Sequence, residues 1–359
     1  MLLSALTFVL VLGILVFIHE LGHFSVAKWS GMRVDEFAIG FPPRIFGVKR
    51  GETTYALNAI PLGGYVKIHG ENIQAEDTDP RSFHNKPMFQ RIAVMVAGVT
   101  MNLLLAVIVL TIAFSVGFSS ISQDLTAIPG ATVVRSQLLA ATVLPGSTAS
   151  TTGIQPGDQI SSLGTQSIAN AKELQVATKQ RQAGNQLDTE FSFIHQGTLI
   201  SKPVTLAATG PALGLGLADD QSIRVPFYRA PAVALKETWS IITVTWEALK
   251  GFGSKLFVHG QLDKDVSGPV GIYQAAASAA HTGFASVVFL LVALSLNLAL
   301  LNILPIPALD GGRLFFLLIE TIFRKRVVAE HIENLINTAG FALIMLLIVI
   351  LSIRDIIHL

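Results

Sequence analysis

The sequence predicts an α-helical multi-pass membrane protein with four transmembrane helices, a membrane-associated β-hairpin and an inserted small α+β domain. Three observations predict this fold. Hydrophobic residues make up 51% of the 359 residues and charged residues only 14%, against about 25% charged residues in a typical soluble domain. Four apolar stretches approach the roughly 20 helical residues that cross a membrane. Between the second and third stretches, short apolar runs alternate with turn signals.

The charge balance and the lack of cysteine exclude several classes of protein. With 25 Lys and Arg against 24 Asp and Glu, the formal net charge is +1, which is too balanced for a nucleic-acid-binding protein. The chain contains no cysteine. Disulfides, thiol nucleophiles and cysteine-ligated metal sites are therefore excluded.

The four predicted transmembrane helices cover Leu2–Phe24, Ile92–Phe118, Phe284–Leu304 and Leu335–Ile353. The first stretch could also be a signal peptide. A signal peptide has a basic segment before its apolar run and a small-residue cleavage site after it. Because no Lys or Arg precedes Lys28 and no such cleavage pattern follows, we expect a retained helix.

Lys and Arg residues are concentrated in two segments that adjoin the predicted spans, and cytoplasmic loops carry such an excess. We therefore expect residues 25–91 and 305–334 to be cytoplasmic, and Ser119–Gly283 and both chain termini to lie outside. The residues counted are Lys28, Arg33, Arg44, Lys49, Arg50, Lys67, Arg81, Lys86, Arg91, Arg313, Arg324, Lys325 and Arg326.

The outer segment is predicted to hold a small domain at 119–220 and a linker at 221–283, between membrane halves at 1–118 and 284–359. In the domain, β-like runs (132–134, 191–194 and 203–206) alternate with turns, and a helical stretch, Ala169–Gln182, interrupts them. In the linker, Trp239 and Trp246 share one helical face. Since Trp prefers the membrane–water boundary, this segment is either an interfacial helix or a helix packed on the domain.

Thr53–Ile68, in the first cytoplasmic segment, is predicted to form a β-hairpin. Strand-like runs lie on both sides of a Pro-Leu-Gly-Gly sequence at 61–64. Pro and Gly are typical of turns, so the prediction places the hairpin turn there.

His19-Glu20-Leu21-Gly22-His23 is the pattern that most directly indicates chemistry. Residues four apart lie on one face of a helix, so both imidazoles can bind one metal ion. Glu20 lies beside that face, where it can accept a proton from a water that the metal activates. Seventeen uncharged residues precede the motif, and ionisable groups inside a span are costly and usually functional. Histidines satisfied by neighbouring helices, or a span that ends at Ile18, are the structural alternatives.

A zinc site of this kind needs a third protein ligand, and Asp310 is the best candidate. At 1.5 Å per residue, His19 lies close to the cytoplasmic end of its helix, and Asp310 follows the third span on the same side. Pro305 and Pro307 make the backbone non-helical before Asp310. A helix cap or a Gly-rich turn is the alternative role of Asp310. The other histidines lie in loops, in the outer domain or at span ends: His69, His84, His195, His259, His281, His331 and His358.

Four segments together carry a resemblance to a known family. They are the motif at His19–His23, the Asn-x-x-Pro-x-Pro-x-Leu-Asp-Gly run that ends at Asp310-Gly311, the segment Ile60–Lys67 and the segment Ser267–Ile272. With these motifs in this order, the chain resembles the site-2 protease family of intramembrane zinc metalloproteases. Within that family it is most similar to the bacterial regulator of sigma-E protease group.

The resemblance implies an enzyme that hydrolyses a peptide bond within or near a transmembrane segment of a membrane-bound substrate. An anti-sigma factor or a signal-peptide remnant would be such a substrate, cleaved in regulated intramembrane proteolysis during a stress response. His19, His23 and Asp310 would be ligands of Zn²⁺, and Glu20 would be the general base.

The resemblance also implies residues that contact the substrate. Asn297 and Asn302 match asparagines thought to hold the substrate, and hydrogen bonding between helices is an equal alternative. Gly63, Gly64 and Tyr65, in the predicted hairpin, would pair with an unwound substrate segment.

Ala149–Ile160 resembles a PDZ signature, so the outer domain is expected to be a single PDZ-like domain. Its partner would be a peptide or a carboxy-terminal end, unless it acts as a size filter. The expected location is the bacterial inner membrane, with the lipid bilayer as a partner, the PDZ-like domain and both termini on the periplasmic side, and the active site near the cytoplasmic face.

Two other classes of protein are open at this stage. A membrane zinc transporter can also place histidines and acids within spans, but it needs a polar path that the second and fourth spans barely offer. A non-catalytic membrane scaffold with a PDZ module leaves Glu20 unexplained.

Overall fold

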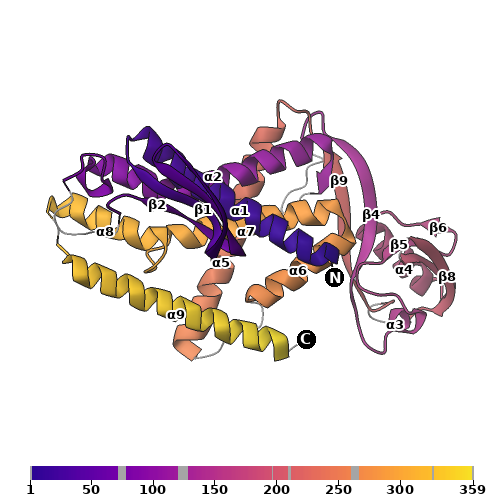
Figure 1. The fold of residues 1–359 in the computed structure, drawn as a ribbon. Coiled ribbons are helices and arrows are strands. Elements are labelled where there is room, and N and C mark those ends of the chain that lie inside the picture. Colours follow the sequence, from indigo (N-terminus) through magenta and orange to yellow (C-terminus); the bar gives the residue numbers. More distant parts are fainter. Residues whose placement is uncertain are drawn as a thin grey trace. The chain divides into compact units, whose positions relative to one another are not determined.

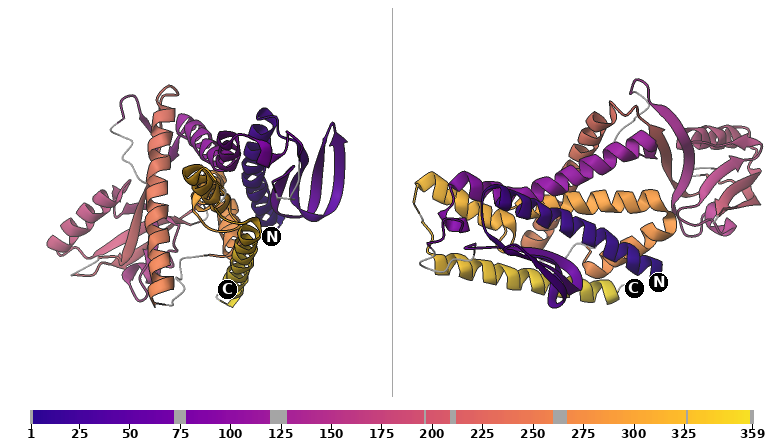
Figure 2. Two further views of the ribbon diagram at one scale, coloured as in Figure 1. Left: turned by 90° about the vertical axis from the view of Figure 1, so that its left-hand side faces the viewer. Right: turned by 45° about the horizontal axis from the view of Figure 1, so that its top comes forward.

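The computed structural model describes residues 2–71, 78–119, 128–195, 197–208, 212–259, 267–325 and 327–357. The chain forms two compact units. The first combines Met1–Leu110 with Ala234–Leu359, and the second is Thr111–Val233, a wider range than the predicted domain at 119–220. Figures 1 and 2 show the helices and strands of both units.

Within the described residues, four helices are long and apolar enough to cross a membrane, by length and composition. They are α1 (Leu2–Trp29), α2 (Met88–Val116), α7 (Phe284–Ile303) and α9 (Glu330–Ile357), and they overlap the four predicted spans. Large apolar side chains remain exposed along them. A helix that is apolar on all sides is stable only inside protein or lipid, so this exposure is typical of helices that face lipid.

Two shorter helices of this unit were not predicted from the sequence. One is α6 (Pro269–Thr282), which contacts α1, α7 and α9. Asp355 of α9 caps it, because the amides of Gly268 and Gly271 donate to Asp355 Oδ2 at 2.8 and 2.9 Å. The other is α8 (Asp310–Phe323), which follows α7 after a short loop. A long helix, α5 (Ala230–His259), covers the stretch with the two tryptophans, as predicted.

The first unit also contains a sheet of two long strands, β1 (Val34–Arg50) and β2 (Thr53–Ile68), which packs on α1 (Figure 2). The strands form a hairpin whose turn lies at Gly51 and Glu52. Residues 61–64 lie inside β2, but the direction of the chain reverses across them, because Leu57 and Gly64 both pair with Ile39. The chain therefore turns back near the predicted position, whereas the two halves of β2 pair with β1 and not with each other as the predicted hairpin requires.

The register shows how β2 surrounds part of β1. Residues Glu36–Ile39 have partners in Thr54–Leu57 and also in Gly64–Lys67. The two halves of β2 therefore flank the same segment of β1 from opposite sides. Within the described chain, the half that contains Gly64–Lys67 has no strand on its other side, so it is an edge strand.

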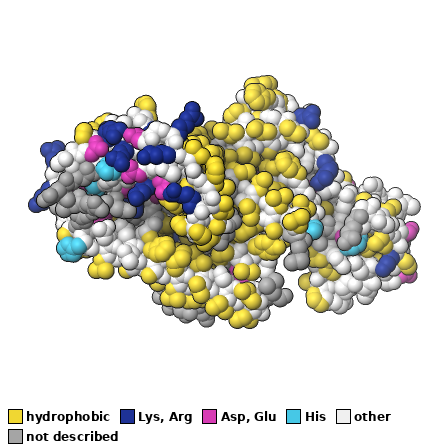
Figure 3. Space-filling view, in the orientation of Figure 1, with side chains coloured by type: hydrophobic (Ala, Val, Ile, Leu, Met, Phe, Trp, Pro, Cys, Tyr) yellow, Lys and Arg dark blue, Asp and Glu magenta, His cyan; other side chains and the backbone are white. Residues whose placement is uncertain are grey.

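Charged side chains gather at one end of the first unit, where α1 ends and α2 begins (Figure 3). Glu52 pairs there with Lys28 at 2.6 Å and with Arg81 at 2.7 Å. Hydrophobic side chains cover the lengths of the helices instead (Figure 3). This distribution is typical of a membrane protein whose charged end is in water.

The second unit is a mixed α and β domain. Its sheet has the order β3-β9-β4-β5-β7-β8, with β6 paired to β5. The core is formed by side chains of the sheet and α4, such as Ile160, Leu174, Phe191 and Phe193. The elements are β3 (Phe118–Ser119), β4 (Thr132–Val143), α3 (Thr148–Thr152), β5 (Gln159–Leu163), β6 (Gln166–Ser167), α4 (Ala171–Ala183), β7 (Asp188–His195), β8 (Thr198–Thr205) and β9 (Leu215–Arg224).

A partly exposed polar network joins three strands of this domain at Asp220 on β9. Its carboxylate accepts three hydrogen bonds, from Ser119 Oγ at 2.5 Å, Arg135 Nη2 at 2.8 Å and Gln137 Nε2 at 2.8 Å. Burial by itself raises the pKa of a carboxyl group, but the three donors outweigh it and hold the pKa of Asp220 below its ordinary value.

We expect Asp220→Asn to lower the free energy of unfolding of this unit by roughly 1 kcal/mol near neutral pH. Because the folded-state pKa of Asp220 lies below the unfolded one, its contribution is present above the ordinary Asp pKa and disappears as the pH falls through the folded-state pKa. Urea-dependent proteolysis at several pH values measures the difference. Asp188→Asn, at the exposed start of β7, is the control, and a loss as large there would contradict the prediction.

Candidate metal centre

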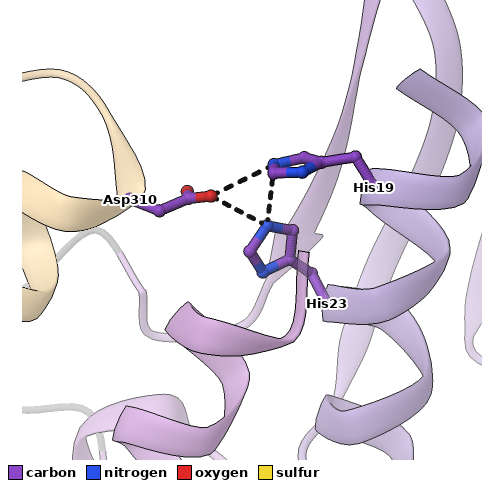
Figure 4. A group of neighbouring side chains, drawn as sticks. All are labelled: His19, His23 and Asp310. Carbon is purple, nitrogen blue, oxygen red and sulfur yellow. Dashed lines mark hydrogen bonds and ion pairs between the residues drawn. The ribbon is translucent and has the colours of Figure 1, made fainter. Parts of the chain in front are cut away.

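His19 and His23 lie on successive turns of α1, and both side chains are buried. Their rings point from the same face of the helix toward Asp310 (Figure 4). The two Nε2 atoms are 3.2 Å apart. The helix and the facing pair predicted from the spacing of four are therefore present.

Asp310 reaches these rings because the chain is irregular between α7 and α8. The loop at 304–309 contains Pro305 and Pro307, as predicted, and Ala308 adopts a left-handed conformation with φ 73°. The amide of Ala308 donates to Asn337 Oδ1 of α9 at 3.2 Å. Asp310 is then the first residue of α8. A Cβ on Gly311 would lie 2.1 Å from the carbonyl oxygen of Leu304, so only glycine permits this tight path.

The three side chains present their ligand atoms to one point. Asp310 Oδ2 lies 3.1 Å from His19 Nε2 and 3.2 Å from His23 Nε2 (Figure 4). Ligands about 2.0–2.1 Å from a tetrahedral zinc ion are separated by about 3.3 Å. Two imidazoles and one carboxylate are also a common protein ligand set of catalytic zinc. The residues therefore fit a zinc ion in both chemistry and spacing.

Helix α2 packs directly against both imidazoles. The carbonyl oxygen of Val94 accepts a hydrogen bond from His23 Nδ1 at 2.8 Å. Two turns further along, the side chain of Asn102 lies 3.3 Å from His19 Nδ1. Gly98 is midway between them. A Cβ there would lie 2.4 Å from His23 Nε2 and 2.6 Å from His19 Cε1, so the missing side chain makes room for both rings.

Of the two asparagines that the sequence singled out on α7, the structure brings one to the cluster. Asn302 is buried, and its Nδ2 lies 3.3 Å from His19 Nε2. Among the described residues, Asn297 makes no hydrogen bond to His19, His23 or Asp310.

Glu20 and the second half of β2 line a cavity of about 950 Å³ beside the three ligands. A Cβ on Gly64 would lie 3.3 Å from Glu20 Cγ and 2.8 Å from Val16 Cγ1, so β2 passes very close to α1 at this point. Tyr65 lines the same cavity, whereas Gly63 does not and instead packs on Phe41.

The sequence analysis missed the contribution of α2. Asn102 and Gly98 lie in a stretch that reads as a plain transmembrane segment, and the search for ligands considered only histidines and acids. The available signal was an amide side chain in the middle of an apolar span, because polar groups there are expensive and usually have a role.

Gly98→Ala should destabilise the metal-free protein, because the new methyl group overlaps both imidazoles. We expect a cost of about 1–3 kcal/mol, despite the gain of about 1 kcal/mol that Ala brings to a helix. Thermal unfolding of the purified protein in detergent measures it. Gly13→Ala is the matched control, since no atom lies within 4 Å of a Cβ at that position. Equal melting temperatures for the two variants would contradict this reading of Gly98.

Comparison with known proteins identifies the family. The model of Peptidase family M50 matches residues 7–347. Three relatives, each named "Putative zinc metalloprotease", match nearly the full length of both chains. The protein of Clostridium perfringens is 36% identical over 96% of this chain and 95% of its own. The protein of Clostridium acetobutylicum is 33% identical over 98% of this chain and 96% of its own. The protein of Nostoc sp. is 31% identical over 98% of this chain and 95% of its own.

The match confirms the resemblance to the site-2 proteases and the expectation of a zinc enzyme. It also supports the interpretation as a protease over those as a zinc transporter or a non-catalytic scaffold. Together with the four apolar helices, it describes an integral membrane protein. The chain belongs to peptidase family M50, the site-2 protease family, and is a zinc metalloprotease.

Proposed function

We propose that this metalloprotease hydrolyses a peptide bond within or near a transmembrane segment of a membrane-bound protein. In this proposal His19, His23 and Asp310 bind the zinc ion. Glu20 transfers the proton. One observation carries the proposal: three ligand atoms lie within 3.2 Å of one another, and two of them belong to a helix long enough to cross a membrane.

The residues of the chain account for each proton in the reaction. When bound, zinc supplies Lewis-acid chemistry, which lowers the pKa of water to about 7 and polarises a carbonyl group. Glu20 accepts the proton that the attacking water loses and returns it to the amide nitrogen as the C–N bond breaks. The oxygen of the water remains in the new carboxyl group together with the second hydrogen of the water, and the other fragment leaves as an amine. Among the described residues, no donor forms a hydrogen bond to the carboxylate of Glu20, so it is available for this role.

Asn302 is suited to hold the substrate at this point. Its amide lies 3.3 Å from His19 Nε2, within reach of a carbonyl group that binds beside the ligands. For Asn297, no contact with the cluster supports the same role, and hydrogen bonding between helices accounts for it equally well.

The edge of β2 suits a substrate that must unwind before cleavage. A transmembrane helix has its backbone groups paired internally, and freed groups need new partners in lipid. The half of β2 at Gly64–Lys67 has an unpaired edge within the described chain and lines the cavity with Glu20. An extended substrate segment can add to that edge as a further strand. The register supports this role, because β1 lies on one side of the Gly64–Lys67 half and, within the described chain, no strand lies on its other side.

The site then lies near the cytoplasmic face of the bacterial inner membrane. His19 and His23 are close to the end of α1 that leads to Lys28, and positively charged residues mark cytoplasmic loops. In the proposal the second unit is a PDZ-like domain on the periplasmic side. It contacts the outer part of the substrate, as a peptide-binding module or as a size filter.

Glu20→Gln should abolish cleavage without loss of zinc. We expect cleavage of a membrane reporter to fall by about 10²–10⁴-fold, because the proton transfer is lost, while metal analysis still finds zinc in the purified protein. Asp310→Asn should lose zinc as well as activity. Glu247→Gln, an exposed carboxylate on α5, is the control for loss of charge. The assignment fails if Glu20→Gln cleaves like the wild type or if Asp310→Asn retains its zinc.

A proline in the β2 edge should slow cleavage and leave zinc binding unchanged, since proline removes an N–H and distorts the strand. Val66→Pro tests the edge beside the cavity, and Val48→Pro tests the opposite edge of the same sheet, where Val48 pairs with Tyr55. We expect Val66→Pro to lower cleavage by about tenfold or more and Val48→Pro to have a much smaller effect. Similar rates for the two variants, at equal zinc content, would argue against strand addition.

A further inference from the structure

The two imidazoles of the cluster differ in how their second ring nitrogen is held. A nitrogen that binds a cation must offer its lone pair, so the other nitrogen of that ring carries the hydrogen and needs an acceptor. For His23, the carbonyl oxygen of Val94 is that acceptor, at 2.8 Å from Nδ1. A carbonyl cannot donate. The Nε2 atom of His23 is therefore free to bind a cation.

For His19, the corresponding group is the side chain of Asn102. It is fully buried and lies 3.3 Å from His19 Nδ1. In the described structure the amide nitrogen faces the ring, and the buried Oδ1 has no hydrogen-bond donor. The two orientations of a carboxamide have almost the same shape. Rotating the amide places Oδ1 against Nδ1 and gives this oxygen a donor, the N–H of His19.

We propose that Asn102 is a positioning residue that holds His19 as the Nδ1–H tautomer, with Nε2 directed at the metal. The proposal rests on His19 being a zinc ligand, as argued above. If the amide nitrogen of Asn102 faced Nδ1 instead, Nδ1 would accept a hydrogen bond from it. The hydrogen of neutral His19 would then be on Nε2, where it would block the ligand position. Val94 and Asn102 thus serve the two histidines in the same way from one face of α2, on either side of Gly98.

A purely structural role for Asn102 is separable from this one. Helix α2 is tied to α7 by Ser295, whose hydroxyl donates to the backbone carbonyl of Asn102 at 2.8 Å. That bond does not involve the side chain of Asn102. Ser295 is fully buried and has no contact with the histidines among the described hydrogen bonds. Ser295→Ala therefore loosens the same packing without changing the acceptor that faces His19.

The experiment measures zinc affinity of the purified full-length protein by competition with chelators of graded strength, and the melting temperature of the zinc-free protein. We expect Asn102→Leu to weaken zinc binding by about 10–100-fold, as loss of such an acceptor does at other zinc sites. Without zinc, His19 can adopt its other tautomer, with the hydrogen on Nε2 facing Asp310 Oδ2, so the melting temperature of the zinc-free variant should stay close to that of the wild type. Ser295→Ala should lower that temperature and change zinc affinity by less than about threefold. Asn102→Asp, which keeps an acceptor in the same place, should retain zinc.

Two results would overturn the proposal: zinc binding by Asn102→Leu within about threefold of the wild type, or a loss of affinity in Ser295→Ala as large as in Asn102→Leu. Loss of zinc in Asn102→Asp at an unchanged melting temperature would also overturn it. His23→Ala separates this proposal from the one on which it rests. If His23→Ala binds zinc like the wild type, the ligand set is wrong. If it loses zinc and Asn102→Leu does not, only the role of Asn102 is wrong.

Discussion

Two buried imidazoles and a partly buried carboxylate lie together among apolar helices, and the neighbouring elements of the first unit hold them there. An ionisable group inside a membrane is stable only when it faces the protein interior and has partners there. His19 and His23 are buried, and each has its Nε2 within 3.2 Å of Asp310 Oδ2. Removing any one of the three leaves the other two without their partner, so the group has to be assembled as a whole.

The neighbouring helices show what that assembly requires. On one side, α2 must come close enough for its backbone to accept from His23, and Gly98 makes this possible by having no side chain. On the other side, the loop before Asp310 holds Ala308 in a left-handed conformation, which costs about 1–3 kcal/mol for a residue with a side chain. Its amide is held by Asn337 of α9. The fourth apolar helix therefore supports a site that contains none of its own side chains as ligands.

The sheet of the first unit shows how much a local turn signal can predict. The chain reverses across residues 61–64, whose composition is that of a turn, but the two halves of β2 pair with β1 between them and not with each other. Turn propensity describes what a short segment does without partners, whereas β1 offers backbone groups on both of its sides. The longer pairing satisfies more of these groups than a short hairpin within Thr53–Ile68 would. It also leaves the Gly64–Lys67 edge beside Glu20, which the short hairpin could not have indicated.

Local patterns in the sequence were enough to predict the apolar helices and the two parts of the metal cluster. Hydrophobic length locates spans because a bilayer has a fixed thickness, and a spacing of four places His19 and His23 on one face because helical geometry is local. Asp310 could be proposed because few acids accompany apolar stretches. The groups of α2 and α9 that support these ligands, and the side of the sheet on which an edge is open, became visible in the folded chain alone. They depend on contacts between residues 71 and 283 positions apart, such as His23 with Val94 and His19 with Asn302, and no local pattern encodes such contacts.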